Sequence, residues 1–75
     1  MDAASRLSHL VPHWIEHNDS HAEQLEEWAA KAREAGLGVA ANEIEAAARA
    51  MKQANEHLGN ARAELPRGNG EEFSS

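Results

Sequence analysis

Residues 32–51, AREAGLGVAANEIEAAARAM, place a glycine turn between two segments of helical character. Gly36 and Gly38 interrupt a chain that is otherwise rich in alanine and glutamate, and a glycine just past the last helical residue commonly ends a helix. Apolar residues recur at steps of three and four on both sides of the turn, which is typical of amphipathic helices. The pattern predicts two helices joined by a short turn at residues 36–38.

Each helical segment carries one stripe of residues that we expect to pack against the other segment. The first stripe comprises Leu7, Val11, Trp14, Asn18, His21, Leu25, Trp28, Ala32 and Ala35. The second stripe comprises Leu37, Ala40, Ile44, Ala47, Met51, Ala54, Leu58, Ala61 and Leu65. The fold class expected from these stripes is all-α, an antiparallel two-helix hairpin with helices at about residues 8–35 and 39–65.

The two ends of the chain give further predictions. Pro12 favours a main helix that begins near residues 8–12, with residues 2–11 as a separate turn or a kinked extension, because proline disrupts a helix interior. Pro66 ends the second helical pattern, and residues 66–75 are polar and aperiodic. One hairpin domain over residues 1–65 and a disordered tail are therefore expected.

The chain is small for an independent fold. It has 75 residues and no cysteine, and a single hydrophobic core of this size supplies about 3–5 kcal/mol at best. Two helices also leave apolar flanks uncovered. A homodimer that forms a four-helix bundle is the expected remedy.

Composition argues against several classes of partner. The net charge of −6 disfavours nucleic acid and anionic lipid, which select basic patches. No apolar run approaches the ~20 residues of a membrane span, and the first residues lack the order of a signal peptide. We expect a soluble, cytoplasmic protein without membrane insertion. The sequence contains neither a nucleophile turn nor a phosphate-binding glycine loop, so no motif in it predicts an enzyme.

Histidines follow each other at a fixed spacing of four: His9, His13, His17 and His21. Side chains four apart on a helix are neighbours, and two imidazoles one turn apart can hold one metal ion. The predicted pairing of the helices brings His57 and Asn55 to the level of His17 and Asn18. The predicted metal ligands are His13, His17, His21 and His57, with Asn18, Asn55 and Met51 as their neighbours, and the predicted ion is Ni, Co, Zn or Cu.

The run HWIEHNDSHA at residues 13–22, followed by Trp28 and by Asn55-Glu56, resembles a family of small, uncharacterised prokaryotic helical proteins with the pattern H-W-I-x-H-N-x-x-H-A. The likeness spans about residues 7–65. Members often carry a histidine-rich amino-terminal tail and are associated with metals such as nickel, cobalt or zinc. By this resemblance the motif positions are His13, His17, Asn18 and His21. This chain lacks the histidine-rich tail, which favours a compact site over bulk metal storage.

Three functions remain open on the sequence. The first is a transition-metal carrier, sensor or accessory module that serves a metal transporter or a metalloenzyme. The second is a ferritin-like di-iron oxidase, because encapsulated ferritins are also two-helix proteins that dimerise around iron; Glu16, Glu23 and His21 would then matter. The third is a metal-free adaptor in which Asn18 and His21 specify helix register.

Overall fold

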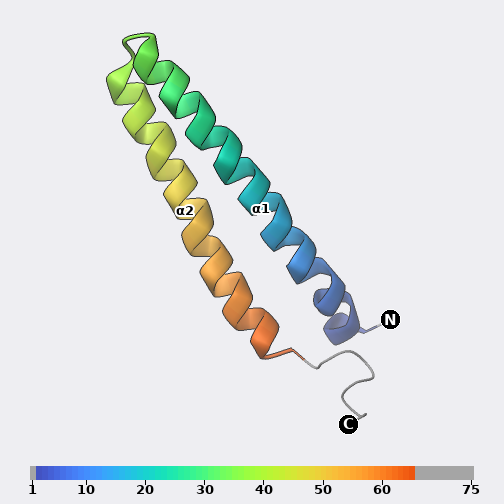
Figure 1. The fold of residues 1–75 in the computed structure, drawn as a ribbon. Coiled ribbons are helices and arrows are strands. Elements are labelled where there is room, and N and C mark those ends of the chain that lie inside the picture. Colours follow the sequence, from blue (N-terminus) through green and yellow to red (C-terminus); the bar gives the residue numbers. More distant parts are fainter. Residues whose placement is uncertain (1, 66–75) are drawn as a thin grey trace.

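The computed structural model describes residues 2–65. Two helices, α1 (Ala3–Glu34) and α2 (Gly38–Ala63), run antiparallel and side by side (Figure 1). The described residues contain no strand, so the predicted all-α hairpin is confirmed. Neither helix combines the length and the apolarity that crossing a membrane requires. The predicted disordered tail, residues 66–75, lies outside the described residues.

Local hydrogen bonds fix both ends of α1. Asp2 caps its start, since the carboxylate Oδ1 accepts a 2.9 Å hydrogen bond from the backbone N–H of Ser5. The same bond lowers the pKa of Asp2 by stabilising its charged form. At the other end, Gly36 has φ +82° and the N–H of Leu37 donates to the carbonyl of Ala32 over 2.8 Å. This left-handed glycine closes α1 and turns the chain into α2.

Gly36 and Gly59 give opposite predictions for alanine substitution. Gly36→Ala places a Cβ at positive φ, which costs about 1 kcal/mol. Gly59 lies inside α2, and a Cβ added there would have no neighbouring atom within 4 Å, so Gly59→Ala gains about 0.5–1 kcal/mol from the lower chain entropy of the unfolded state. The midpoint of urea denaturation should be lower than the parent's for Gly36→Ala and higher than the parent's for Gly59→Ala. A Gly36→Ala protein as stable as the parent would contradict the turn described above.

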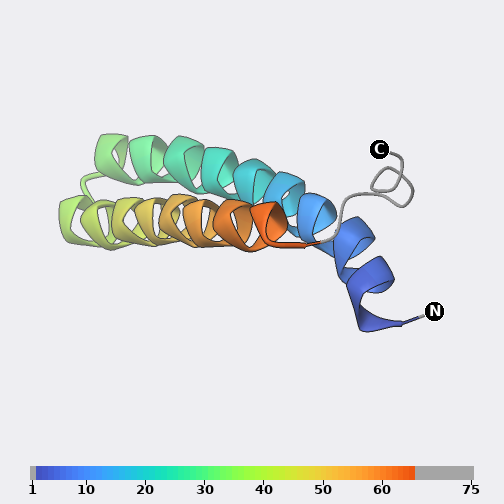
Figure 2. The ribbon, with the colours of Figure 1, turned by 90° about the horizontal axis from the view of Figure 1, so that it is seen from below.

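Pro12 bends α1 without ending it. The helix begins at Ala3, before the predicted start near residue 8, and runs through Pro12. The amino-terminal part turns away from the line of α2 (Figure 2). A proline has no N–H to donate and its ring crowds the preceding turn, which accounts for the bend. Val11 still reaches the core at 3% exposure, whereas Leu10 is 38% exposed.

The two helices meet along a stripe that we call the seam, made of buried and half-buried residues with alternating steps of three and four. On α1 the seam comprises Val11, Ile15, Asn18, Ala22, Leu25, Ala29 and Ala32, and on α2 it comprises Ala41, Ile44, Ala48, Met51, Asn55 and Leu58. Its fully buried members are one valine and four alanines: Val11, Ala22, Ala29, Ala41 and Ala48. Alanines at the contact let the helix axes approach closely.

The observed seam differs from the predicted stripe by one residue at every second position. The sequence predicts Trp14 and Trp28 in the core, but they are 40% and 59% exposed, and the neighbouring residues Ile15 and Ala29 take their places. The predicted and observed stripes share Val11, Leu25 and several others, and adjacent residues on a helix differ by about 100° in direction. Both stripes therefore satisfy the same spacing. Alanines at the alternative positions allow the helices to pack closely, whereas indoles there would hold them apart.

The seam separates two sides of different character. On one side, Glu26 of α1 pairs with Lys52 of α2 at 2.7 Å, and Arg33 pairs with Glu45 at 2.6 Å. The hydrogen bond from Lys52 to Glu26 raises the pKa of that lysine. Glu26 and Arg33 each follow a seam residue by one position. We call this side the charged side.

The opposite side of the hairpin carries the residues that precede seam positions by one. On α1 these include Trp14, His21 and Trp28, and on α2 they are Ala40, Glu43, Ala47, Ala50, Ala54 and His57, all of them exposed. The residue before a seam position and the residue after it differ by about 200° in direction around the helix axis. The residues named here therefore lie on the side of the hairpin opposite the charged side. We call this side the tryptophan face. Its members are Leu7, Leu10, Trp14, His17, His21, Gln24, Trp28 and Lys31 of α1 and Ala40, Glu43, Ala47, Ala50, Ala54, His57 and Ala61 of α2.

Candidate metal site

Three histidines form a ladder along the outer surface of α1. The ring centroids of His13 and His17 are 6.4 Å apart with planes inclined by 25°, and those of His17 and His21 are 4.5 Å apart with planes inclined by 61°. His13 and His17 are exposed, and His21 is half-buried at the edge of the seam. The four-residue spacing therefore places the rings in contact, as the sequence predicts.

The pair His17 and His21 has the geometry of a half-site. Two imidazoles with centroids 4.5 Å apart can each direct a nitrogen at one ion, which lies about 2.0–2.1 Å from a ligating nitrogen in zinc sites. A closed zinc site needs four ligands. Within residues 2–65 of one chain, no group of three or more histidine, aspartate or glutamate side chains is placed to hold a metal ion. One hairpin thus brings together two imidazoles, fewer than the four ligands of such a site.

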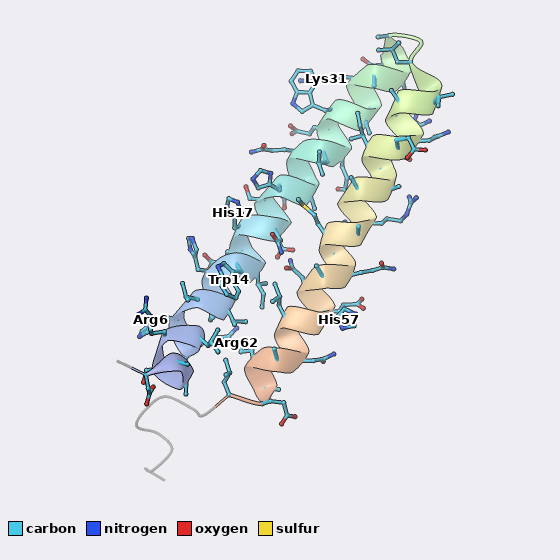
Figure 3. The ribbon with its side chains drawn as sticks, turned by 180° about the vertical axis from the view of Figure 1, so that it is seen from behind. Arg6, Trp14, His17, Lys31, His57 and Arg62 are labelled. Atoms are coloured by element: carbon cyan, nitrogen blue, oxygen red, sulfur yellow. The ribbon has the colours of Figure 1, made fainter. Side chains whose placement is uncertain are left out.

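His57 does not join this pair within one hairpin. Figure 3 shows His17 on the outer side of α1 and His57 on the outer side of α2, so that the two side chains point away from each other. The predicted juxtaposition required Ala54 to face α1. The structure places Asn55 there instead, which rotates His57 outward.

Asn18 and Asn55 bond to each other across the seam rather than to a histidine ring. The Asn18 amide Nδ2 donates to Asn55 Oδ1 over 3.1 Å. Asn55 Nδ2 donates to the carbonyl of Ile15 over 3.1 Å and to the carboxylate of Asp19 over 2.8 Å. Both amide hydrogens and the amide oxygen of Asn55 therefore have partners. The polar layer predicted at Asn18 exists and joins the two helices at that level. Met51, predicted beside the histidines, is half-buried in the seam.

Sequence reasoning missed two features of this region. Asp19 completes the amide network, but it follows Asn18 directly and therefore resembles one more acidic surface residue in the sequence. Trp28 has the spacing of a packing residue, yet the Lys31 ammonium lies 4.3 Å from the centre of its ring as a cation–π contact on the surface. The seven-residue spacing of Trp14, His21 and Trp28 places all three on one line of the helix.

Comparison with known proteins places the chain in a family. The model of a domain of unknown function, DUF8180, matches residues 7–65. No curated protein and no solved structure matches the chain. Since the family model covers most of the sequence, the chain belongs to the DUF8180 family of domains of unknown function.

Proposed function

We propose that this protein binds a divalent transition-metal ion through His17 and His21. The observation that carries the proposal is the 4.5 Å contact between the two rings on an open side of α1. Imidazole nitrogens suit Ni, Cu, Zn and Co, and the seam residues around them offer no thiolate or carboxylate that would favour a different class of ion. His13 stacks on His17 one turn earlier, with ring centroids 6.4 Å apart.

The position of the pair supports handling of an ion rather than permanent storage. His17 is exposed in the single hairpin, so an ion bound by one copy can exchange with solvent or with another protein. The role consistent with such a site is a carrier, a sensor or an accessory module for a protein that transports or uses the metal. The site would act in a protein that we propose to be cytoplasmic and dimeric.

A pair of double variants with equal histidine loss tests this proposal. Protein purified without a histidine tag is titrated with Ni²⁺, Co²⁺, Zn²⁺, Cu²⁺ or Fe²⁺ and its metal content is measured after dialysis. His17→Ala/His21→Ala should lose stoichiometric binding, because both rings of the half-site are removed. His9→Ala/His57→Ala removes two histidines that lie away from the pair, and this variant should retain stoichiometric metal binding. Equal binding by both variants, with circular dichroism showing both folded, would refute the proposal.

A metal-free adaptor is the second candidate, and the Asn18–Asn55 pair favours it. Amides that bond to each other in a helix interface fix register and partner choice. An adaptor needs no ion, so metal chelation should leave its mass and thermal midpoint unchanged. A metal-binding protein should lose stability on chelation, because an ion that binds only the folded state stabilises that state.

A further inference from the structure

We infer that two copies pack tryptophan face to tryptophan face with their α1 helices antiparallel, so that the His17–His21 pairs of both copies meet and hold one ion. The shared ion rests on the proposed function. The pairing of the faces does not, because it follows from the packing of the hairpin alone. The two parts can therefore fail separately.

The core of one hairpin is too small to leave this face uncovered. Its buried residues are a valine and four alanines, and within residues 2–65 no large side chain is fully buried. Most helix stability in proteins comes from packing an apolar face, and alanines alone bury little apolar surface. Trp14 at 40% and Trp28 at 59% exposure carry the largest apolar surfaces of the tryptophan face. A second copy supplies the missing layer of a four-helix bundle.

The tryptophan face of α1 is a second heptad seam. Its residues alternate steps of three and four: Leu7, Leu10, Trp14, His17, His21, Gln24, Trp28 and Lys31. The positions in this pattern are symmetric about residue 19. When a second α1 helix runs antiparallel with its residue 19 at the same level, each position of one helix therefore meets a position of the other. His17 then faces the partner's His21, and Leu10 faces the partner's Trp28.

Charge favours the antiparallel order over the parallel one. At the rim of the antiparallel pair, Arg6 lies near the partner's Glu34, and His13 lies near the partner's Glu27. A parallel pair would instead place Lys31 against the partner's Lys31 inside the contact. Like charges brought together in this way are unfavourable.

The alanines of α2 permit the same two-fold arrangement. Because Asn18 lies opposite Asn55, residue 19 of α1 is level with Ala54 of α2. Ala54 therefore faces the partner's Ala54, and Ala47 faces the partner's Ala61. Small residues at these contacts let the α2 helices approach each other while the α1 helices pack. The copy thus covers both helices of the tryptophan face.

Pairing completes the half-site. Each copy contributes two imidazoles close to the two-fold axis, which gives the four nitrogen ligands that a single chain lacks. A ligand set of four neutral imidazoles suits Zn, Cu, Co and Ni more than the oxygen-preferring ions Mg and Ca. The expected stoichiometry is one ion per two chains.

Two single cysteine variants test the pairing, since the chain has no cysteine of its own. Ser20 and Gln24 are both exposed, and neither substitution removes a histidine or a tryptophan. In the antiparallel pair, residue 20 lies close to residue 20 of the partner, next to the two-fold axis. Residue 24 and residue 24 of the partner are instead about 15 Å apart along the helices. Ser20→Cys should form a covalent dimer with a short thiol cross-linker, and Gln24→Cys should not.

The outcomes separate the two parts of the inference. Cross-linking of Gln24→Cys instead of Ser20→Cys would show a parallel pair, and a monomeric mass by light scattering would remove the pairing altogether. His17→Ala/His21→Ala in the Ser20→Cys background should lose the ion and keep the cross-link. Cross-linking with no metal uptake would defeat the proposed function and leave the pairing in place. Cross-linking with one ion per chain would defeat only the shared site.

Discussion

Ala29→Leu should remove a large part of the protein's free energy of unfolding. Ala29 is fully buried where α1 meets α2, and its neighbours in the seam are alanines that allow the helices to pack closely. Extra methylene groups in such a contact typically cost about 1–3 kcal/mol. Because a core of this size supplies only about 3–5 kcal/mol, the variant keeps little stability. Far-ultraviolet circular dichroism and a urea titration measure the loss.

Ala30→Leu is the matched control for this variant. It makes the same chemical change one position later, on an exposed residue away from the tryptophan face. Its free energy of unfolding should stay close to that of the parent. If Ala29→Leu proved as stable as Ala30→Leu, Ala29 would not lie in the seam, and the stripe through Trp28 would be the better description.

Asn55→Ala should be the most damaging change to a polar residue. It removes hydrogen bonds to Asn18, Asp19 and the carbonyl of Ile15 at once. Leaving a half-buried amide without its partner costs about 1–3 kcal/mol. The midpoint of urea denaturation should fall accordingly. Asn60→Ala, an exposed amide further along α2, should change it little.

The double variant Asn18→Leu/Asn55→Leu separates stability from register. Apolar residues that replace both members of a polar pair can match or exceed the stability of the parent. The hairpin would then lose the bonds that fix Asn18 opposite Asn55, so alternative helix registers should become accessible. Broader amide signals with unchanged or higher urea resistance are the expected result. Lower stability than in Asn55→Ala alone would contradict this account.

The fold could be predicted from the sequence, but the choice of seam could not. Gly36 and the three-and-four spacing define two helices and a turn whatever the register. Two overlapping stripes share Asn18 and Leu25, and a spacing rule cannot choose between Trp28 and Ala29 as the inward residue. That choice depends on side-chain volume across the contact, which requires both helices in place.

The candidate site was predictable only within one helix. A spacing of four places His17 beside His21 on any α-helix, and the structure has their rings 4.5 Å apart. The predicted place of His57 beside His17 depended on how α2 is rotated about its own axis. With Asn55 rather than Ala54 facing α1, His57 lies on the outer surface of α2. Asn18 and Asn55 were correctly expected at one level, because the length of the turn sets that level and the rotation of α2 changes it little.

The exposed indoles also give the protein its own optical reporters. The chain contains two tryptophans and no tyrosine, so its intrinsic fluorescence arises almost wholly from Trp14 and Trp28. Each lies seven residues from His21, about 10 Å along the helix axis. The colour of their emission therefore records whether water reaches the tryptophan face, and quenching by a paramagnetic ion such as Cu²⁺ records its arrival among the histidines. No label is needed to follow either event in real time.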